Sequence, residues 1–383
     1  MIRSIKFKPV NWVDGMRLSS AQFVNNDQYY QDKIRDAASS TLTPYTYGLL
    51  GHMGEGIQSF DIQISVKSTH TVHIAIRYCH ALTAAGHRIH IEPDQNGKAR
   101  IATDIVLPQP DLGMFQNYRL LLCVDLFGRS PHGELDAAVD PPRYPFVEPK
   151  YSIIMVPESD YISNGYVDGS LPIGRLLVDG AGLRTDPQFL PPCMAIASHP
   201  LLRMYYTKFV EWTYQLQESA FTILGKTDMD AAVTPLGKSL RLVTQHLVGF
   251  LAGNMYQLKH QYYVAAPVEL IGVYANAALQ LLSAMRCLPR KDRDDLLKYI
   301  YEWRDINPAS FEELLTRTIE INFDQENSAV AFSLVEEFLM EVTALWQRLA
   351  ALDYIGQHKE NIVVAEQQVV QQVQQKKIWT LLD

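Results

Sequence analysis

The fold of this chain is indicated first by Phe60-Asp61-Ile62-Gln63-Ile64-Ser65-Val66, where apolar and polar residues alternate one by one. A period of two is typical of a β-strand that buries one face and exposes the other. Residues 71–78 repeat the alternation, and shorter apolar runs follow at 88–91, 118–124, 151–156 and 174–178, with prolines and glycines between the runs. Many short strands divided by turn residues predict an antiparallel sandwich or barrel instead of βαβ units.

Ahead of these strands, the chain opens with Pro9-Val10-Asn11-Trp12-Val13-Asp14-Gly15-Met16-Arg17-Leu18 and continues with Ser19-Ser20-Ala21-Gln22-Phe23. Trp12 offers a large apolar ring for burial, and Gly15 permits a turn. Ser20 is expected to cap a helix that begins at Ala21 and ends near residue 39. The residues alone favour a strand, a turn and a first helix over a binding site here, and we expect Trp12 and Phe23 to be packing anchors.

After residue 200 the apolar spacing changes to alternating steps of three and four, which predicts helices. The first stripe consists of Tyr205, Phe209, Trp212 and Leu216, and later stripes predict helices at 240–258, 270–285, 292–303, 311–319 and 328–349. The helix at 311–319 is expected to have Ser310 as its N-cap, with Glu313 three residues on. The predicted fold class is α+β, with a β-rich domain at 1–200, a helical bundle at 201–322 and a C-terminal helical extension at 323–383.

The composition indicates a folded soluble protein, because 47% of the 383 residues are hydrophobic and 20% are charged. With a formal net charge of −8 and no basic run, the chain is not expected to bind nucleic acid, which requires clustered Lys and Arg. The four scattered cysteines predict reduced thiols, and residues 1–4 lack the apolar core of a signal peptide. Since no run is expected to reach the ~20 apolar residues that span a bilayer, we predict an intracellular protein without membrane insertion.

The sequence contains no residue pattern typical of catalysis or cofactor binding. Five histidines lie close together in the sequence: His70, His73, His80, His87 and His90. His73 and His80 are seven positions apart on one predicted strand and so point to opposite faces, and the same parity separates His87 from His90. We therefore expect surface histidines and no metal site. The glycine-rich residues 48–56 lack a Gly-Lys-Ser/Thr ending, and no nucleophile elbow or zinc-protease motif occurs, so we expect no cofactor and no catalytic residue.

The opening stretch resembles the signature of the TssK family, the trimeric baseplate component of bacterial type VI secretion systems. The residues that carry this match are Trp12, Gly15, Met16, Leu18 and Phe23, whereas Gln22 stands where the family usually has His. A second match lies in Leu171-Pro172-Ile173-Gly174-Arg175-Leu176 and then Phe189-Leu190-Pro191-Pro192-Cys193, which is similar to the elements that close the family's N-terminal domain. Weaker matches to the family lie at Tyr47-Gly48 and at Pro267-Val268-Glu269-Leu270. The matches cover about the first three quarters of the chain.

This resemblance implies a non-enzymatic assembly protein, cytoplasmic and placed at the inner face of the inner membrane through the baseplate. It implies a homotrimer that binds the TssF–TssG wedge, with a β-sandwich similar to the shoulder of phage receptor-binding proteins. The signature residues, together with Arg175, Pro191 and Pro192, are expected near this shoulder and wedge, with Arg175 as a structural partner of buried carbonyls or an acid. The stripe Tyr205, Phe209, Trp212 and Leu216 is hypothesised to add to the threefold contact, although burial within one chain is the simpler explanation.

The end of the chain departs from the family. TssK proteins usually carry a third, mostly β head domain after the helices, which docks on the membrane proteins TssL and TssM. Here the sequence after Asn322 has helical spacing, so we expect either that the head is missing or that a helical appendage replaces it, and docking on a membrane-complex protein is in doubt. The apolar cluster Ile378, Trp379, Leu381 and Leu382 is expected to dock into a groove on a neighbouring subunit or on a partner. Two alternatives stay open: a phage-tail or virion adsorption protein, and a hydrolase whose β domain binds a ligand.

Overall fold

A computed structural model of the chain describes residues 4–51, 59–68, 70–107, 116–164, 169–179, 182–228, 234–304, 306–353 and 355–358. The chain forms two compact units. The first unit contains Met1–Arg203, Tyr263–Val268 and Phe323–Ala329, and the second contains Met204–Tyr262, Glu269–Asn322 and Val330–Asp383. The chain therefore returns to the first unit twice after leaving it, which the apolar spacing of the sequence does not indicate.

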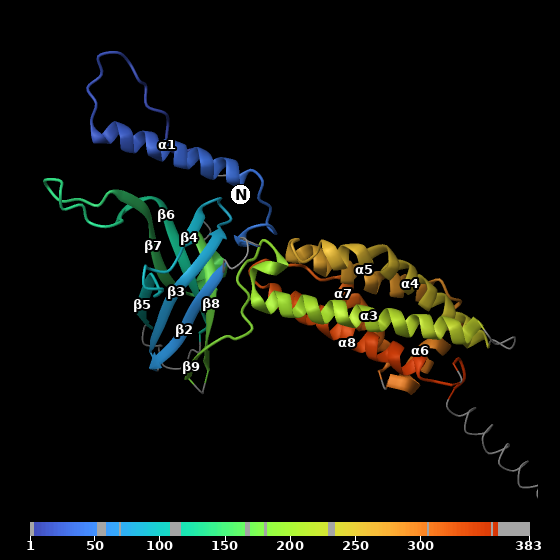
Figure 1. Cartoon of the computed structure of the whole chain (residues 1–383). Coiled ribbons are helices and arrows are strands. Elements are labelled where there is room, and N and C mark those ends of the chain that lie inside the picture. The colour runs from blue at the N-terminus through green and yellow to red at the C-terminus, as the bar shows by residue number, and fades with distance from the viewer. Residues whose placement is uncertain are drawn as a thin grey trace, which may run out of the picture. The chain divides into compact units, whose positions relative to one another are not determined.

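The first unit contains two antiparallel sheets (Figure 1). One sheet is built around β3 (Thr71–Leu82), which pairs with β1 (Gly48–Leu49), β2 (Phe60–Ser68), β4 (Arg88–Ile91) and β5 (Ile101–Val106). The other has the order β7-β6-β8-β9, made of β6 (Tyr118–His132), β7 (Phe146–Pro157), β8 (Ser170–Asp179) and β9 (Gly182–Thr185). Every apolar run predicted as a strand lies inside one of these strands, so those predictions are confirmed.

Alternation along β3 places its apolar side chains in the core of this unit. Val72, Ile74 and Ile76 are fully buried, as a strand with one internal face requires. The two sheets approach closely at Gly174 of β8, where an added Cβ would lie 2.5 Å from Ile64 Cδ1 of β2. The backbone of the second sheet can come this near to the first only because the residue has no side chain.

The first unit also contains α1 (Ser20–Ser39), α2 (Glu158–Asn164) and a short 3-10 helix, η1 (Ile196–Ser198). The predicted helix near the N-terminus is confirmed, but its predicted cap is wrong. The N-cap is Ser19, one residue earlier, whose backbone N–H donates to Gln22 Oε1 at 2.9 Å in a capping box. Gln22 sits at the third helical position only when the helix begins at Ser20, and this reciprocal bonding favours that start over Ala21.

The second unit is helical, and the chain enters it within α3 (Pro200–Asp228). The helices that follow are α4 (Pro235–His260), α5 (Pro267–Arg286), α6 (Arg290–Arg304), α7 (Pro308–Ile319) and α8 (Ser328–Ala350). The helices predicted between residues 200 and 349 are confirmed, whereas the end of the predicted helical extension, residues 359–383, lies outside the described residues. The predicted cap of α7 is wrong, because the Asn307 side chain accepts a hydrogen bond from the backbone N–H of Ala309 at 2.9 Å and Pro308 begins the helix. Proline suits this first position, which needs no N–H donor.

Among the described residues, α5 is the one helix long and apolar enough to span a bilayer by length and composition. This contradicts the expectation that no run is sufficiently apolar. Leu270, Tyr274 and Leu281 of α5 are nevertheless buried within the chain, and the Tyr274 hydroxyl lies 3.1 Å from Thr213 Oγ1 of α3. A core helix of a bundle passes the same test of composition, so α5 is explained by its packing against other helices.

Candidate assembly interface

Residues 4–39 form an N-terminal arm that is held together by a buried ion pair. The Asp32 carboxylate accepts hydrogen bonds from the backbone N–H groups of Lys6 and Phe7, the latter at 3.1 Å. Arg35 Nε donates to the other carboxylate oxygen at 2.9 Å, and an Arg35 terminal nitrogen donates to the Ser4 carbonyl at 3.4 Å. Asp32 and Arg35 are almost completely buried. The extended residues 4–8 are therefore fastened to α1 through its polar face.

The Asp32 carboxylate makes the arm sensitive to acid. Burial by itself raises the pKa of Asp32, but the hydrogen bonds from Phe7, Lys6 and Arg35 outweigh burial and lower it below its ordinary value. A carboxyl group whose pKa is lowered by folding stabilises the fold above about pH 4, and that contribution is lost as the pH falls through the lowered pKa. The arm is therefore expected to stay attached at neutral pH and to loosen only in strong acid.

Replacing Asp32 by alanine is expected to release residues 4–8 from α1. The change leaves the buried Arg35 guanidinium without its carboxylate, which costs about 3 kcal/mol. Hydrogen–deuterium exchange should show faster exchange at the amides of Lys6 and Phe7, whereas Asp14→Ala, at an exposed position of the arm, should leave those amides unchanged. Unchanged protection in Asp32→Ala would contradict the proposed role of this ion pair.

The arm exposes large apolar side chains while it buries polar ones. Trp12 and Phe23 are 48% and 55% exposed, and their ring centroids lie 6.2 Å apart. The expectation that these two residues are packing anchors within the chain is therefore wrong. The exposed members define the arm's apolar face: Trp12, Val13, Leu18, Phe23, Tyr30 and Ile34. A group of exposed apolar residues of this size on one segment is typical of a surface that another chain covers.

Two further signature residues shape the turn that presents this face. Gly15 has φ of +76°, a left-handed conformation that glycine adopts without strain. The Met16 backbone N–H donates to the Val13 carbonyl at 3.2 Å and closes the turn. The turn brings Trp12 back beside Phe23 of α1, which explains why a glycine stands between the two aromatic residues.

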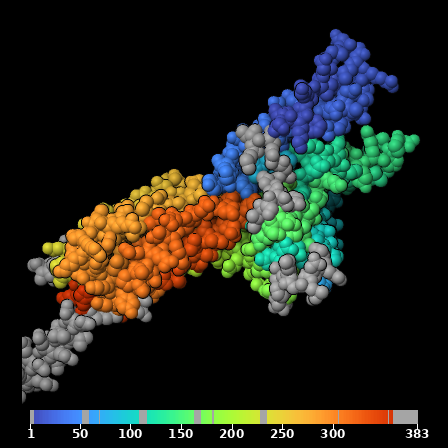
Figure 2. All heavy atoms as spheres, turned by 180° about the vertical axis from the view of Figure 1, so that it is seen from behind, coloured from blue at the N-terminus to red at the C-terminus, as the bar shows by residue number. Residues whose placement is uncertain are grey.

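The arm lies beside the far end of the β6–β7 hairpin (Figure 1). Arg129 of β6 and Asp27 of α1 are 3.5 Å apart, and the rings of Phe7 and Phe127 are 4.6 Å apart. The arm stands out from the sheets of its unit with solvent around much of its length (Figure 2). Most of its apolar face is therefore accessible to another chain.

The weak sequence match at Tyr47-Gly48 and the stronger match at residues 189–193 are neighbours in the structure. The Leu49 backbone N–H donates to the Pro192 carbonyl at 2.7 Å, and Leu49 forms a parallel bridge with Cys193. Gly48 has φ of +116°, and an added Cβ would lie 2.0 Å from the Pro192 oxygen. The Pro191 carbonyl accepts a hydrogen bond from the Cys193 thiol at 3.2 Å. Glycine at position 48 is thus required both by conformation and by this close approach.

The segment Phe323–Ala329, which joins α7 to α8, is fastened to the same place. Gln325 Nε2 donates to the carbonyls of Tyr47 and Cys193 at 2.9 and 2.6 Å. Glu326 Oε1 accepts from the Tyr47 and Tyr161 hydroxyls at 3.2 and 2.7 Å. The pKa values of Tyr47 and Tyr161 are raised mainly by burial and next by the nearby Glu326 carboxylate. Both hydroxyls therefore stay protonated and donate.

Two arginines of the second sheet, Arg119 and Arg175, extend the polar contacts around Glu326 and Glu158. Arg119 of β6 lies 3.7 Å from Glu326 and 3.4 Å from Glu158 of α2. Arg175 of β8 lies 2.8 Å from Glu158 and 3.7 Å from Asp186. Arg175 therefore pairs with two acids, as expected for a structural arginine.

Replacing Glu326 by alanine is expected to lower the free energy of unfolding of the first unit by about 2 kcal/mol. The change removes the one carboxylate oxygen that accepts from both tyrosine hydroxyls, together with one partner of Arg119, and hydrogen bonds to a charged group contribute about that amount. Calorimetry should show a lower melting temperature, and Glu313→Ala, at an exposed position of α7, is the matched control. Equal melting of the two variants would show that the cluster adds nothing to stability.

The structure corrects the proposed trimer stripe. Tyr205, Phe209 and Leu216 are only 7%, 0% and 2% exposed within the single chain. The Phe209 ring packs against Tyr274 and Phe332, with centroids 5.5 and 6.1 Å away. Side chains with so little accessible surface cannot make much contact with another subunit, so these three belong to the core of the helical unit.

Two other sets of predicted residues have different outcomes. Trp212 keeps partial exposure, and the Lys208 ammonium lies 4.7 Å above its ring. The expected docking residues Ile378, Trp379, Leu381 and Leu382 lie outside the described residues. Of the whole stripe, only Trp212 stays a candidate for a contact with another chain.

The parity argument against a histidine cluster is incomplete. It holds along a single strand, but His80 of β3 and His90 of β4 lie directly opposite each other in neighbouring strands. Together with Glu92 they form the group of possible metal ligands found among the described residues. Pairing between strands, which the sequence does not state, brings them together.

The fold defines a class of protein: an α+β chain that joins an antiparallel β unit with an exposed N-terminal arm to a helical unit. The solved structures that resemble this chain include structures of TssK. A crystal structure of TssK matches with a TM-score of 0.50 and 16% sequence identity, over 87% of this chain and 69% of that chain. The chain therefore has a TssK-like fold, as its sequence motifs predict.

Two other TssK structures match with lower scores. TssK from the type VI secretion system of EAEC, in complex with a nanobody, gives a TM-score of 0.47 at 13% identity, over 84% of this chain and 98% of that one. A cryo-electron microscopy structure of a TssK–TssF–TssG baseplate subcomplex gives 0.45 at 15% identity, over 82% and 99%. No protein-family model and no curated protein matches the sequence.

Proposed function

We propose that this protein is a structural subunit of a type VI secretion baseplate that takes the place of TssK and catalyses no reaction. The observation that carries the proposal is the match of 87% of the chain to the fold of TssK, with a TM-score of 0.50. One matched structure is a TssK–TssF–TssG subcomplex, which supports TssF- and TssG-like wedge proteins as the partners of this chain. A baseplate subunit of this kind acts in the cytoplasm at the inner membrane.

The arm's apolar face is the surface best suited to the wedge. Its aromatic members offer large apolar area at little cost in side-chain entropy, and aromatic residues are enriched at the centres of protein interfaces. The Asp32–Arg35 pair keeps the arm folded before the partner arrives, which reduces the entropy lost on binding. The wedge is therefore expected to cover Trp12, Leu18 and Phe23.

The two antiparallel sheets are proposed to form a shoulder-like sandwich, and the chain is proposed to work as a homotrimer. The close approach of Gly174 to Ile64 supports face-to-face packing of the sheets. Because the bundle stripe is buried, the subunit contacts must lie on other surfaces of the chain, and partly exposed Trp212 is one candidate.

Co-expression of the untagged chain with tagged TssF and TssG homologues from the same genome tests this function. We expect the three proteins to co-purify and the free chain to give, by light scattering, the mass of three copies of 43.4 kDa. A monomeric chain that is not retained by the wedge proteins would refute the proposal. Retention by tail proteins of a phage, with capsid genes beside its own gene, would instead favour an adsorption protein.

A further inference from the structure

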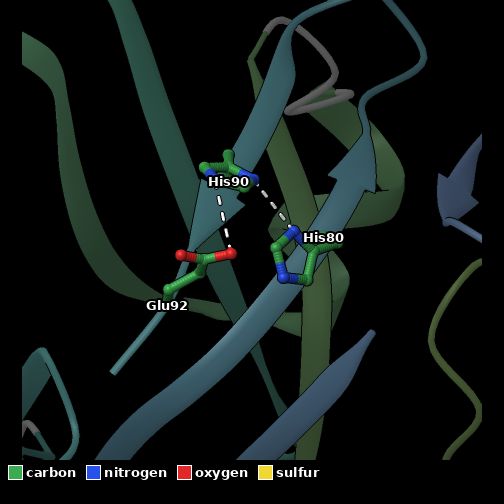
Figure 3. Close-up of side chains that lie close together, drawn as sticks. All are labelled: His80, His90 and Glu92. Atoms are coloured by element: carbon green, nitrogen blue, oxygen red, sulfur yellow. Dashed lines mark hydrogen bonds and ion pairs between the residues drawn. The ribbon is translucent and has the colours of Figure 1, made fainter. Parts of the chain in front are cut away.

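Three side chains with metal-binding atoms gather on one face of the β3–β4 hairpin (Figure 3). His80 Nδ1 and His90 Nδ1 are 3.0 Å apart, and Glu92 Oε1 lies 3.7 Å from His90 Nε2. One possible ligand atom from each residue can be chosen so that all three lie within 4.8 Å of one another. Two imidazole nitrogens bound to one tetrahedral zinc ion at 2.0–2.1 Å are about 3.3 Å apart, close to the spacing seen here.

The backbone holds these residues in place without help from an ion. His80 and His90 are paired across the antiparallel ladder, and Glu92 follows His90 by two positions, which puts it on the same face. The Tyr151 hydroxyl of the second sheet accepts from the His90 backbone N–H at 3.2 Å. The buried Ile89 and Ile91 anchor the opposite face of β4 in the core. The two histidines are therefore positioned by paired strands, and Glu92 follows directly after the end of β4.

His80 is fully buried, and a neutral imidazole is the form of histidine that binds metal ions. His80 Nδ1, which lies 3.0 Å from His90 Nδ1, is the ring nitrogen whose spacing fits coordination of one ion together with His90.

The surroundings allow an ion to enter from solvent. His90 and Glu92 are 55% and 54% exposed, so two of the three ligands are accessible. The Glu92 carboxylate offsets part of the ion's charge. The nearest cation, Arg88, directs one terminal nitrogen to the carbonyls of Ala81 and Ile89 at 3.1 and 2.6 Å, away from the imidazole pair. Mixed imidazole and carboxylate ligands suit zinc and other divalent transition metals better than calcium or magnesium.

We propose that His80, His90 and Glu92 bind one divalent transition-metal ion, with Zn²⁺ as the probe that tests it, and leave a fourth coordination position open. Three protein ligands and an open position are a stable arrangement for zinc, and the fourth ligand is a water molecule or a group of another molecule. This inference does not depend on the proposed baseplate function, because it rests on residues of the β3–β4 hairpin alone.

Zinc binding by the full chain, with any histidine tag removed, tests the site. Competition with a chromophoric chelator at pH 7.5 should show one Zn²⁺ per chain, and His90→Ala should weaken that binding at least roughly ten-fold because a direct ligand is lost. Glu92→Gln should weaken it as well. His70→Ala is the matched control, since His70 is an exposed histidine on the loop before β3 that is not part of the cluster. His90 and Glu92 are preferred to His80 as targets because exposed residues can be changed without damage to the core.

A spectroscopic measurement separates ligation from indirect effects. The chain loaded with Co²⁺ should show visible absorption typical of a four-coordinate ion, and His90→Ala should lose it while keeping the melting temperature of the metal-free protein. Stoichiometric zinc binding that is equal in the original chain, His90→Ala and His70→Ala would overturn the proposal. So would the absence of any zinc binding by the original chain at micromolar concentrations.

Discussion

Replacing Trp12 and Phe23 together by alanine is expected to abolish capture of the chain by the TssF–TssG wedge while its melting temperature stays the same. Both rings are about half exposed, so their removal takes little packing away from the free chain. An aromatic residue at the centre of an interface typically contributes 2 kcal/mol or more, which corresponds to roughly 30-fold in affinity for each. Pull-down with tagged wedge proteins, followed by calorimetry of the free variant, measures both effects.

The matched control is Tyr301→Ala, which removes an aromatic ring of similar exposure from α6. That variant should be retained by the wedge as well as the original chain. If the Trp12 and Phe23 variant is retained equally well, the arm's apolar face is not the wedge contact, although the chain can still be a baseplate subunit. If the melting temperature of the variant falls, the two rings stabilise the fold of the free chain. That result would contradict their proposed role in binding the wedge.

Replacing Phe209 by alanine is expected to destabilise the helical unit by about 4 kcal/mol, as loss of a fully buried phenylalanine generally does. The change leaves a cavity between Tyr274 and Phe332, two large side chains that cannot close it without moving their helices. For a unit of this size, the melting temperature should fall by roughly 10 °C. Calorimetry of the variant, together with light scattering, distinguishes a core role from a contact role.

Met204→Ala provides the comparison, because Met204 lies in the same helix and is 53% exposed. Its melting temperature should change little. A contact between subunits would give the opposite pattern for Phe209→Ala, with a smaller mass in light scattering and nearly unchanged melting. That result would restore the threefold contact that the burial of this residue argues against.

The strands and helices could be predicted because they depend on local periodicity. Alternation at 60–66 and steps of three and four after residue 200 report which side of an element faces the core, and the structure agrees with both. The caps were less predictable, since Ser19 and Ser20 are chemically equal candidates. The bonding of Gln22 selects Ser19, and this selection depends on backbone geometry that a residue list does not contain.

The candidate sites were only partly predictable, because each is made by residues distant in the sequence. The signature residues Trp12 and Phe23 were found, but whether an aromatic ring is buried or exposed depends on what packs above it. Nothing in the sequence pairs Gly48 with Pro192, or brings Gln325 to both Tyr47 and Cys193. These contacts arise from the return of Phe323–Ala329 to the first unit.

By itself, the sequence determined the kind of each element and the motifs that resemble TssK, because both are properties of neighbouring residues. Only the tertiary structure decided that the arm turns its apolar face outward, that Phe209 belongs to the core, and that His80 and His90 face each other across two strands. The physical reason is the same in each case. Burial and strand register are set by which distant segments pack together, and a pattern of nearby residues carries no record of that choice.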